Sequence, residues 1–356
     1  MDSTPELRIP ASDLTSFLCT ILHNLGADHE QTAVVCEALV WSDLIGRRTH
    51  GVWRFPAYAQ RFQKGLLKCP CEPRVTRCAP ASSHVDGDGG FGHFVAHFAM
   101  DVAIQQAREV GASIVTVSNS NHFGVAGYYA NLAAQKNMVG LVLSNSIAKM
   151  APTGGVKPVF GTNPLAYGLP RKNSPPLLFD SATSAVSGGS VIRAQEQGEC
   201  IPEGALVDDK GQFITDPSRA DEGVMLPFGG AKGAGLALLV ELLTGILAGG
   251  SISTEVRSMF NDFSGNGNNS HCFIAIDIGQ LLSIGQYYER LELLVGLLHE
   301  SAASEHKPVR LPGEERWRLL EKNQIDGVPL ESSLIKQLIA LAGAASVSIP
   351  TVLTEY

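Results

Sequence analysis

Apolar side chains near the start of the chain recur at the spacing of one face of an amphipathic helix. After Ser12, which can act as an N-cap, they follow at intervals of about three and four residues as far as Gly26, which favours a helix end. The apolar positions are Leu14, Phe17, Leu18, Ile21, Leu22 and Leu25. This pattern predicts an N-terminal helix that buries one face.

Two more helices are expected before residue 70. Asp28 and Gln31 stand at capping-box spacing, which predicts a helix that reaches about Leu44. After a polar loop at residues 46–55, a third helical stretch runs from about Pro56 to Leu67.

From about residue 73, short β-branched runs alternate with helical patterns. The expected buried strands are Ser113–Ser118, Val139–Ser144, Leu177–Asp180 and Cys272–Asp277. The expected helices are Val95–Val110, Ala126–Lys136, Gly233–Ala248, Gly285–His299 and Ser332–Ala344. We therefore predict an α/β fold in which residues 1–72 and 310–356 form a discontinuous helical domain and residues 73–309 form the α/β core.

Composition and charge exclude several classes of protein. Apolar residues make up 44% of the chain, and 27 Lys and Arg against 35 Asp and Glu give a net charge of −8. An acidic, apolar-rich chain favours neither disorder nor nucleic-acid or anionic-membrane partners. The N-terminal ten residues lack the pattern of a secretory leader, and Gly233–Gly250 is too short and polar for a membrane span. Seven irregularly spaced cysteines predict reduced thiols and a cytoplasmic location.

Residues 87–92 match the GxGxxG pattern of dinucleotide-binding loops. A Rossmann loop also needs a preceding strand and an acidic residue at the end of the next strand. The next expected strand, Ile114–Val117, runs into Ser118–Asn121 with no carboxylate. We interpret the match as a glycine-rich turn that leads into a helix.

The polar loop after the second helix carries the first candidate for chemistry. His50 can deliver or remove a proton near neutral pH, and the hydroxyl of Thr49 can orient its ring. Arg54 offers a planar fork that suits a carboxylate. A structural hydrogen-bonding pair could use the same residues, so this motif alone leaves both roles open.

Three further motifs follow strands or open helices. Ser118–Gly124 lies between a strand and a helix, where backbone amides attract anions, although an N-capping turn has the same pattern. Thr162 and Asn163 lie in a proline-fixed turn, and Asp180 ends an apolar strand, where a carboxylate is costly unless it is paired or functional. Lys232 stands at a glycine-rich helix entrance that does not match the Walker A pattern.

Taken in chain order, these motifs resemble the malate/L-lactate dehydrogenase family, whose members lack a Rossmann fold. The family also contains Δ1-piperideine-2-carboxylate/Δ1-pyrroline-2-carboxylate reductases and ureidoglycolate, sulfolactate and diketogulonate oxidoreductases. The segments that carry the resemblance are Asp43–Gly51, Asn121–Gly124, Gly161–Pro164, Asp180–Ser184, Gly229–Gly233 and Arg310–Glu314. They cover nearly the whole chain and are specific for the family but not for the substrate.

The resemblance implies a mixed central sheet, a homodimer, and hydride transfer from NADH or NADPH to the carbon next to a carboxylate. It implies that His50 is the proton donor, that Thr49 works with it, and that Arg54, Thr162 and His122 contact the substrate. The positions that it assigns to cofactor contacts are His122, Phe123, Gly124, Val125, Ala126, Asp180, Ser181, Ala182, Gly188, Gly189, Ala231, Lys232, Arg310, Pro312, Gly313 and Glu314. It implies no metal.

Two departures from the family pattern bear on catalysis and cofactor choice. Ser190 stands where relatives carry an acid or a lysine, so the relay to His50 is incomplete unless Asp180 supplies the carboxylate. Ala231 replaces a frequent histidine beside Lys232, which leaves NADP or NAD open, with a slight preference for NADPH.

Three functions therefore stay open. The first is reduction of a 2-oxo acid, as in malate or lactate formation, which the stretch Asn121–Tyr129 favours slightly. The second is reduction of a cyclic imine that carries a 2-carboxylate. The third is a family member that has lost catalysis and binds a partner, which Ser190 and Ala231 would suit.

Overall fold

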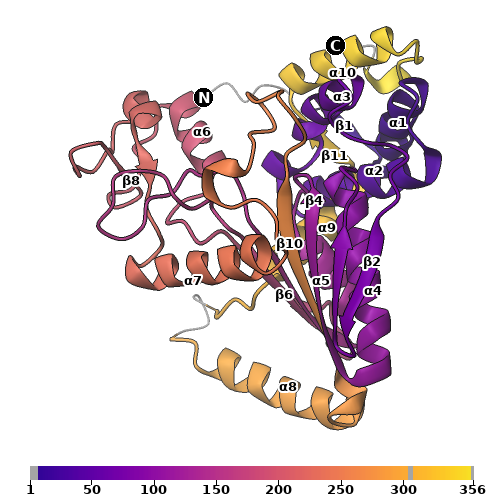
Figure 1. The fold of residues 1–356 in the computed structure, drawn as a ribbon, viewed down its shortest axis with the longest axis vertical. Coiled ribbons are helices and arrows are strands. Elements are labelled where there is room, and N and C mark those ends of the chain that lie inside the picture. The colour runs from indigo at the N-terminus through magenta and orange to yellow at the C-terminus, as the bar shows by residue number, and fades with distance from the viewer. Residues whose placement is uncertain (1–6, 304–307, 354–356) are drawn as a thin grey trace.

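A mixed β-sheet forms the centre of the computed structural model, which describes residues 7–303 and 308–353 (Figure 1). Seven strands of the described residues pair in the order β2-β3-β4-β10-β5-β6-β7, and among them β3 and β4 run parallel while the other neighbours are antiparallel. The strands are β2 (Arg74–Ala79), β3 (Ser82–Asp86), β4 (Ala112–Ser120), β5 (Met138–Ser144), β6 (Leu165–Leu169), β7 (Leu177–Ser181) and β10 (Asn269–Asp277). The expected mixed sheet is confirmed.

Helices cover both faces of the middle of the sheet. α4 (Gly92–Val110) and α5 (Ala126–Ala134) pack on one face, and α7 (Ala231–Glu241) with the π-helical turn Leu242–Ile246 lies on the other. The two-residue period of a strand explains this: Phe273 of β10 joins the core under α4, while its neighbour Cys272 joins Val240 of α7. Both faces of β10 are therefore buried.

A helical layer unites the two ends of the chain. It contains α1 (Ala11–Asn24), α2 (His29–Leu44), α3 (Phe55–Gln63), α9 (Glu314–Asp326) and α10 (Ser332–Ala344), with strand β1 (Leu7–Ile9) paired to β11 (Val328–Leu330). Leu18 and Leu39 share one hydrophobic cluster with Leu338 and Leu353. The expected domain boundaries stay a prediction, and the outermost residues, 1–6 and 354–356, lie outside the described range.

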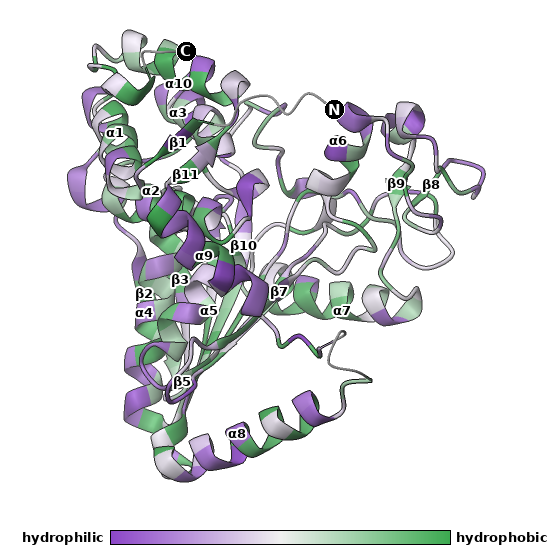
Figure 2. Cartoon of the chain, turned by 180° about the vertical axis from the view of Figure 1, so that it is seen from behind, coloured by the Kyte–Doolittle hydropathy of each residue, from purple (hydrophilic) through white to green (hydrophobic). Residues whose placement is uncertain are grey.

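The rest of the chain forms a second lobe and a projecting helix. α6 (Gly188–Gln197), β8 (Leu206–Val207) and β9 (Val224–Met225) belong to the lobe, and α8 (Ile284–Glu300) extends away from the sheet (Figure 2). Of the residues of α8, Val295 alone is buried. Short 3-10 turns lie at Arg48–His50, Val52–Arg54, Pro217–Glu222, Ser253–Glu255, Ile278–Gln280 and Thr351–Leu353. Within the described part of the chain, no helix combines the length and apolarity that a membrane crossing requires.

Local signals at the N-terminal helices were partly correct. Asp28 caps α2, because its carboxylate accepts a hydrogen bond of 3.0 Å from the Gln31 amide. The Ser12 cap was wrong: Pro10 takes the N-cap position, its carbonyl accepts from the Leu14 amide, and α1 begins at Ala11. The third expected stretch, to Leu67, ends earlier at Gln63, before Gly65 adopts a φ of +70°.

The glycine-rich turn at residues 87–92 does lie between a strand and a helix, and β3, α4 and β4 form a parallel unit. Its amides are nevertheless occupied by protein, because Gly87 donates to the Ser118 carbonyl and Gly89 to the Asn119 carbonyl, both at 2.9 Å. A Cβ on Gly92 would lie 2.1 Å from the Asn121 carbonyl oxygen. Glycine at these positions therefore leaves room for the loop after β4 to pack closely, which supports the interpretation of residues 87–92 as a structural turn.

Candidate active site

The loop between α2 and α3 (residues 45–54), which we call the His50 loop, is held by a buried carboxylate. Asp43, near the end of α2, accepts a hydrogen bond of 2.7 Å from the Val52 amide. A Cβ on Gly51 would lie 2.4 Å from the same carboxylate oxygen, so glycine is needed for the close approach. Burial raises the pKa of Asp43 to about 7. The sequence analysis gave Asp43 no role, although a carboxylate in a helix that packs in the core was a usable signal.

His50 is half-buried in this loop. The Thr49 hydroxyl lies 3.1 Å from its Nδ1, as expected for a residue that orients the ring. The ring stacks loosely on His122, with 5.8 Å between centroids and 27° between planes. Burial lowers the pKa of His50 well below its ordinary value, and the charges of Arg54 and Arg47 lower it further.

Arg54 is a half-buried cation without an acidic partner among the described residues. Its Nε donates to the Thr49 carbonyl at 2.7 Å, and one terminal nitrogen contacts the Met259 sulfur at 3.0 Å. The guanidinium carbon lies 5.2 Å from the centre of the Phe260 ring. Because these partners carry no negative charge, the guanidinium is suited to an anionic ligand.

His122, on the loop after β4, faces a tyrosine that the sequence analysis missed. The Tyr58 hydroxyl lies 2.6 Å from His122 Nδ1, and the Gly124 amide donates to the same nitrogen at 3.2 Å. Burial lowers the pKa of His122 well below its ordinary value, and the Arg54 charge adds to this shift. Tyr58 follows Arg54 by four residues, a spacing that places both on one helical face and that could have identified it.

Asp180 lies at the end of the edge strand β7 and is paired with the protein. Its carboxylate accepts a hydrogen bond of 2.8 Å from the Gly127 amide in the first turn of α5 and lies 4.0 Å from Arg316. Its carbonyl accepts from Arg47 at 3.1 Å and from Arg316 at 2.7 Å. These bonds tie the His50 loop, α5 and α9 to β7, and none of them reaches the His50 ring.

The stretches expected to contact the cofactor converge on β7. The Leu178 amide donates to the Pro312 carbonyl at 3.0 Å, which places the Arg310–Glu314 segment along the strand. A Cβ on Gly189 would lie 2.7 Å from Thr49 Cγ2, so the start of α6 contacts the His50 loop. The Phe228 amide donates to the Thr183 carbonyl, which brings the turn before Ala231 and Lys232 beside the Asp180–Ala182 stretch. The expected segments thus gather along β7, with Arg310–Glu314 beside its first half and the other segments near its end at Asp180 and Ser181.

Two expected site residues have structural partners. The Ser190 hydroxyl lies 2.7 Å from that of Ser187, at the N-terminus of α6. The Thr162 carbonyl accepts from the Thr183 amide at 2.8 Å, and its hydroxyl lies 3.4 Å from Ser146 Oγ. The hydrogen bonds of Ser190 therefore do not join it to His50, and its part in a relay stays a prediction.

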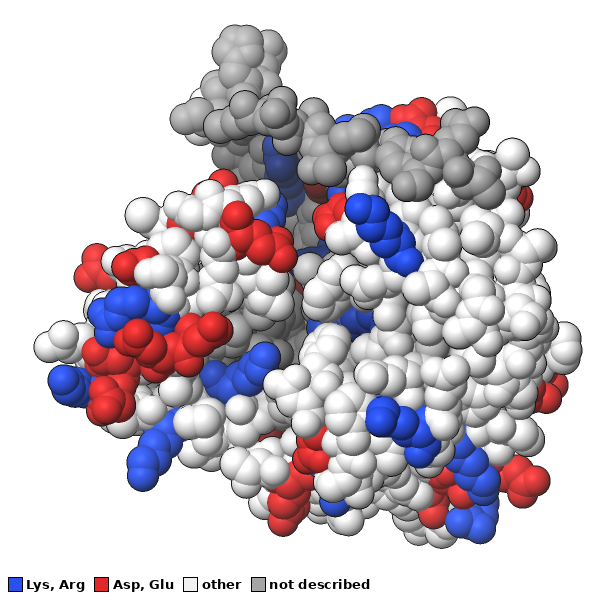
Figure 3. All heavy atoms as spheres, turned by 90° about the horizontal axis from the view of Figure 1, so that it is seen from above, with Lys and Arg blue, Asp and Glu red and all other residues white. Residues whose placement is uncertain are grey.

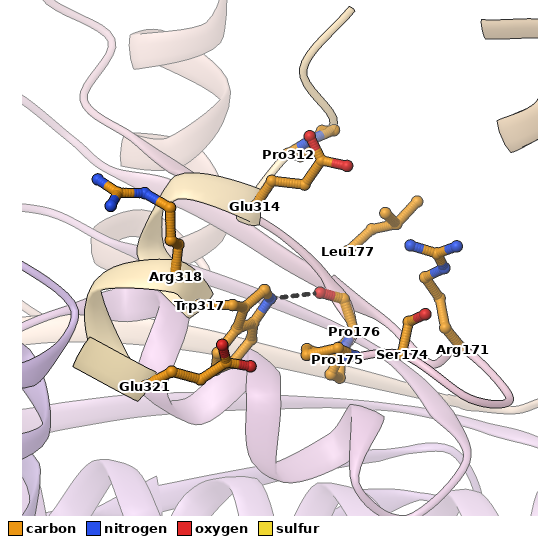
Figure 4. Close-up of a pocket in the computed structure, with 10 residues that line it drawn as sticks. All are labelled: Arg171, Ser174, Pro175, Pro176, Leu177, Pro312, Glu314, Trp317, Arg318 and Glu321. Atoms are coloured by element: carbon orange, nitrogen blue, oxygen red, sulfur yellow. Dashed lines mark hydrogen bonds between the residues drawn. The ribbon is translucent and has the colours of Figure 1, made fainter. Parts of the chain in front are cut away.

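A separate hollow lies at the other end of β7 (Figure 4). Trp317 closes it by donating from its indole N–H to the Pro176 carbonyl at 2.8 Å, and Arg171 and Arg318 stand on opposite sides. Its lining residues are Arg171, Ser174, Pro175, Pro176, Leu177, Pro312, Glu314, Trp317, Arg318 and Glu321. Its lining includes two of the expected cofactor positions, Pro312 and Glu314, but neither His50 nor His122.

Charged side chains of both signs lie on the face that contains the hollow between the two lobes. In the view of Figure 3, basic and acidic side chains are interspersed, and some Lys and Arg atoms lie inside the hollow between the two lobes. The described residues contain no cluster of three or more His, Cys, Asp or Glu side chains that could hold a metal ion.

The chain is similar to known oxidoreductases along nearly its whole length. The sequence model described as malate/L-lactate dehydrogenase matches residues 9–339. A malate dehydrogenase of Pyrococcus abyssi is 35% identical over 345 residues, covering 94% of each chain. A Δ1-pyrroline-2-carboxylate/Δ1-piperideine-2-carboxylate reductase of Pseudomonas aeruginosa is 32% identical over 94% of this chain and 99% of its own.

The solved structures agree with the sequence comparison. The sulfolactate dehydrogenase of Methanocaldococcus jannaschii superposes with a TM-score of 0.91 at 31% identity, covering 99% of each chain. Fold, motif order and sequence similarity therefore lead to one conclusion. This chain belongs to the malate/L-lactate dehydrogenase family of oxidoreductases.

Proposed function

We propose that this protein is an NAD(P)H-dependent oxidoreductase that reduces a 2-oxo acid to a 2-hydroxy acid, with His50 as the proton donor. The observation that carries the proposal is that His50 and Arg54 lie on one loop, each bonded to Thr49, and that the guanidinium has no acidic partner among the described residues. A substrate carboxylate on Arg54 would form two parallel charge-assisted bonds and hold C2 near His50.

Substrate binding would also prepare His50 for proton transfer. The Arg54 charge is one of the causes that lower the pKa of His50. A carboxylate bound to Arg54 offsets that charge, so the pKa of His50 rises when the substrate is in place. The imidazolium then protonates the C2 oxygen as negative charge develops there, a contribution of about 10²–10⁴-fold in rate.

The segments around β7 have the chemistry that a dinucleotide requires. Gly188 and Gly189 offer amides at the start of α6, and Lys232 and Arg310 are exposed cations without an ion pair among the described residues. These groups would hold the phosphates of the dinucleotide, and we retain the slight preference for NADPH. When bound, the nicotinamide supplies the hydride.

We infer further that the protein works as a cytoplasmic homodimer. α8 exposes Leu293, Leu294, Leu297 and Leu298, the first three of them by more than half of their surface. α7, its π-helical turn and the residue after that turn expose Leu238, Leu239, Leu242, Ile246 and Leu247. Such apolar rows favour a protein partner, and all seven cysteines are free, as suits a reducing compartment.

Reduction of a cyclic imine with a 2-carboxylate is the alternative, because Arg54 and His50 would serve that substrate equally. The 32% identity to the Pseudomonas aeruginosa reductase supports it. Both reactions consume NADH or NADPH and one proton for each substrate molecule.

The test follows cofactor absorbance at 340 nm with NADH or NADPH and pyruvate, oxaloacetate, sulfopyruvate or Δ1-pyrroline-2-carboxylate. We expect turnover with a 2-oxo acid, and His50→Ala should lower kcat by about 10²–10⁴-fold while cofactor affinity stays the same. His29→Ala, at an exposed histidine at the start of α2, is the matched control. Unchanged turnover in His50→Ala would reject His50 as the proton donor. No turnover with any of these substrates, together with no binding of NADH or NADPH, would favour a noncatalytic homologue.

A further inference from the structure

His122 is held by two donors that approach the same ring nitrogen. The Tyr58 hydroxyl lies 2.6 Å from Nδ1 and the Gly124 amide 3.2 Å from it. A backbone N–H can only donate, so Nδ1 of His122 must be an acceptor without a proton. Tyr58 then also donates, since Nδ1 has no proton to give it. The proton of neutral His122 therefore resides on Nε2.

The surroundings keep His122 neutral as well as correctly oriented. An imidazolium would carry a second proton on Nδ1, directed at two donors. The charged and titratable groups that act on His122 are Arg54, His50, His93 and His271, and each of them opposes a positive charge there. Burial raises the pKa of the Tyr58 hydroxyl, so it keeps its proton and remains a donor.

His93 packs against Tyr58 and Gly124, the two residues that donate to His122. It is 1% exposed, neither ring nitrogen has a hydrogen-bond partner among the described residues, and its ring meets Tyr58 edge-on at 5.0 Å. A Cβ on Gly124 would lie 2.8 Å from His93 Nε2, and Gly124 has a φ of +77°. Glycine is thus required where the amide reaches Nδ1 of His122.

We propose that Tyr58 is a positioning residue that holds His122 as a neutral Nε2–H donor to the C2 oxygen of the substrate, while His50 delivers the proton. This inference rests on the proposed function and deepens it. The two stacked rings then have separate tasks. The neutral imidazole of His122 polarises the carbonyl without losing its proton, and His50 transfers a proton to the C2 oxygen.

Tyr58→Phe removes the hydroxyl and keeps the ring that packs on His93. We expect kcat with the 2-oxo acid to fall by about tenfold, with KM and cofactor affinity nearly unchanged. Tyr128→Phe is the matched control, because it removes a tyrosine hydroxyl that bonds Glu37 at 3.2 Å instead of a histidine. Equal kcat values for Tyr58→Phe and the wild-type enzyme would overturn the proposal.

A second pair of variants tests which nitrogen acts. The amide of glutamine reaches the position of Nε2 and that of asparagine the position of Nδ1, so His122→Gln should retain more activity than His122→Asn. The reverse order would contradict the proposal.

Nitrogen NMR of the selectively labelled wild-type protein reads the tautomer without any turnover. We expect the His122 signal of a neutral ring protonated at Nε2 between pH 6 and 8, and an Nδ1–H tautomer or an imidazolium would overturn the inference. Because this readout needs no substrate, it separates failure of the His122 tautomer assignment from failure of the proposed reaction.

Discussion

His93 should make the fold sensitive to acid. Burial lowers its pKa to about 3, whereas an exposed histidine in the unfolded chain titrates near about 6.5. Between these values the unfolded state binds a proton that the folded state does not, so stability falls as the pH falls from about 6.5 towards 3. Above that window His93 contributes no pH dependence.

The size of the effect follows from the two pKa values. Each pH unit inside the window costs about 1.4 kcal/mol per histidine, so lowering the pH from 7 to 5 removes about 2 kcal/mol through His93. His93→Leu removes the titrating group without leaving a partner unpaired, because neither ring nitrogen has one among the described residues. The other buried titrating groups are the same in both proteins and cancel in the difference.

The assay is urea unfolding at pH 7 and pH 5 and constant ionic strength, followed by circular dichroism. The wild-type protein should lose about 2 kcal/mol more than His93→Leu between the two pH values. Asn131→Leu is the control, since it replaces a buried amide that does not titrate. If wild type and His93→Leu lose the same free energy of unfolding, the argument from a buried neutral imidazole is refuted.

Three further predictions concern the site and the assembly. Arg54→Lys should raise KM for the 2-oxo acid about tenfold with a smaller change in kcat, because an ammonium cannot form the bidentate pair, and steady-state kinetics measure this. Gly51→Ala should lower the free energy of unfolding by about 1–3 kcal/mol in urea, since its Cβ would meet the Asp43 carboxylate at 2.4 Å; unchanged stability would contradict the close packing. Leu297→Glu, on the exposed row of α8, should shift the protein from dimer to monomer in light scattering.

Much of the local structure could be predicted from short-range patterns. The helix capped by Asp28, the strands at Val139–Ser144 and Cys272–Asp277 and the helix at Ser332–Ala344 were expected close to their observed bounds. These elements carry their signal in their own side chains, as capping geometry or apolar periodicity. The motif order identified the family for the same reason, because each motif is contiguous in the chain.

Elements with weak local signals were missed. β2 exposes every residue, and Val85 is the one apolar residue of β3, so neither strand offers a clear apolar period. α9 is strongly polar and owes its place to Trp317 and Arg316, which bond to the β7 region far away in the sequence.

The roles within the site depended on tertiary contacts. The sequence alone determined that a histidine, a hydroxyl and an arginine stand together on one polar loop, because six consecutive positions contain them. Tertiary structure decided that Tyr58 and Gly124 both reach Nδ1 of His122, and that the Asp180 carboxylate binds α5. A proton's location on a ring depends on which donors fold against it, and no spacing along a chain records that.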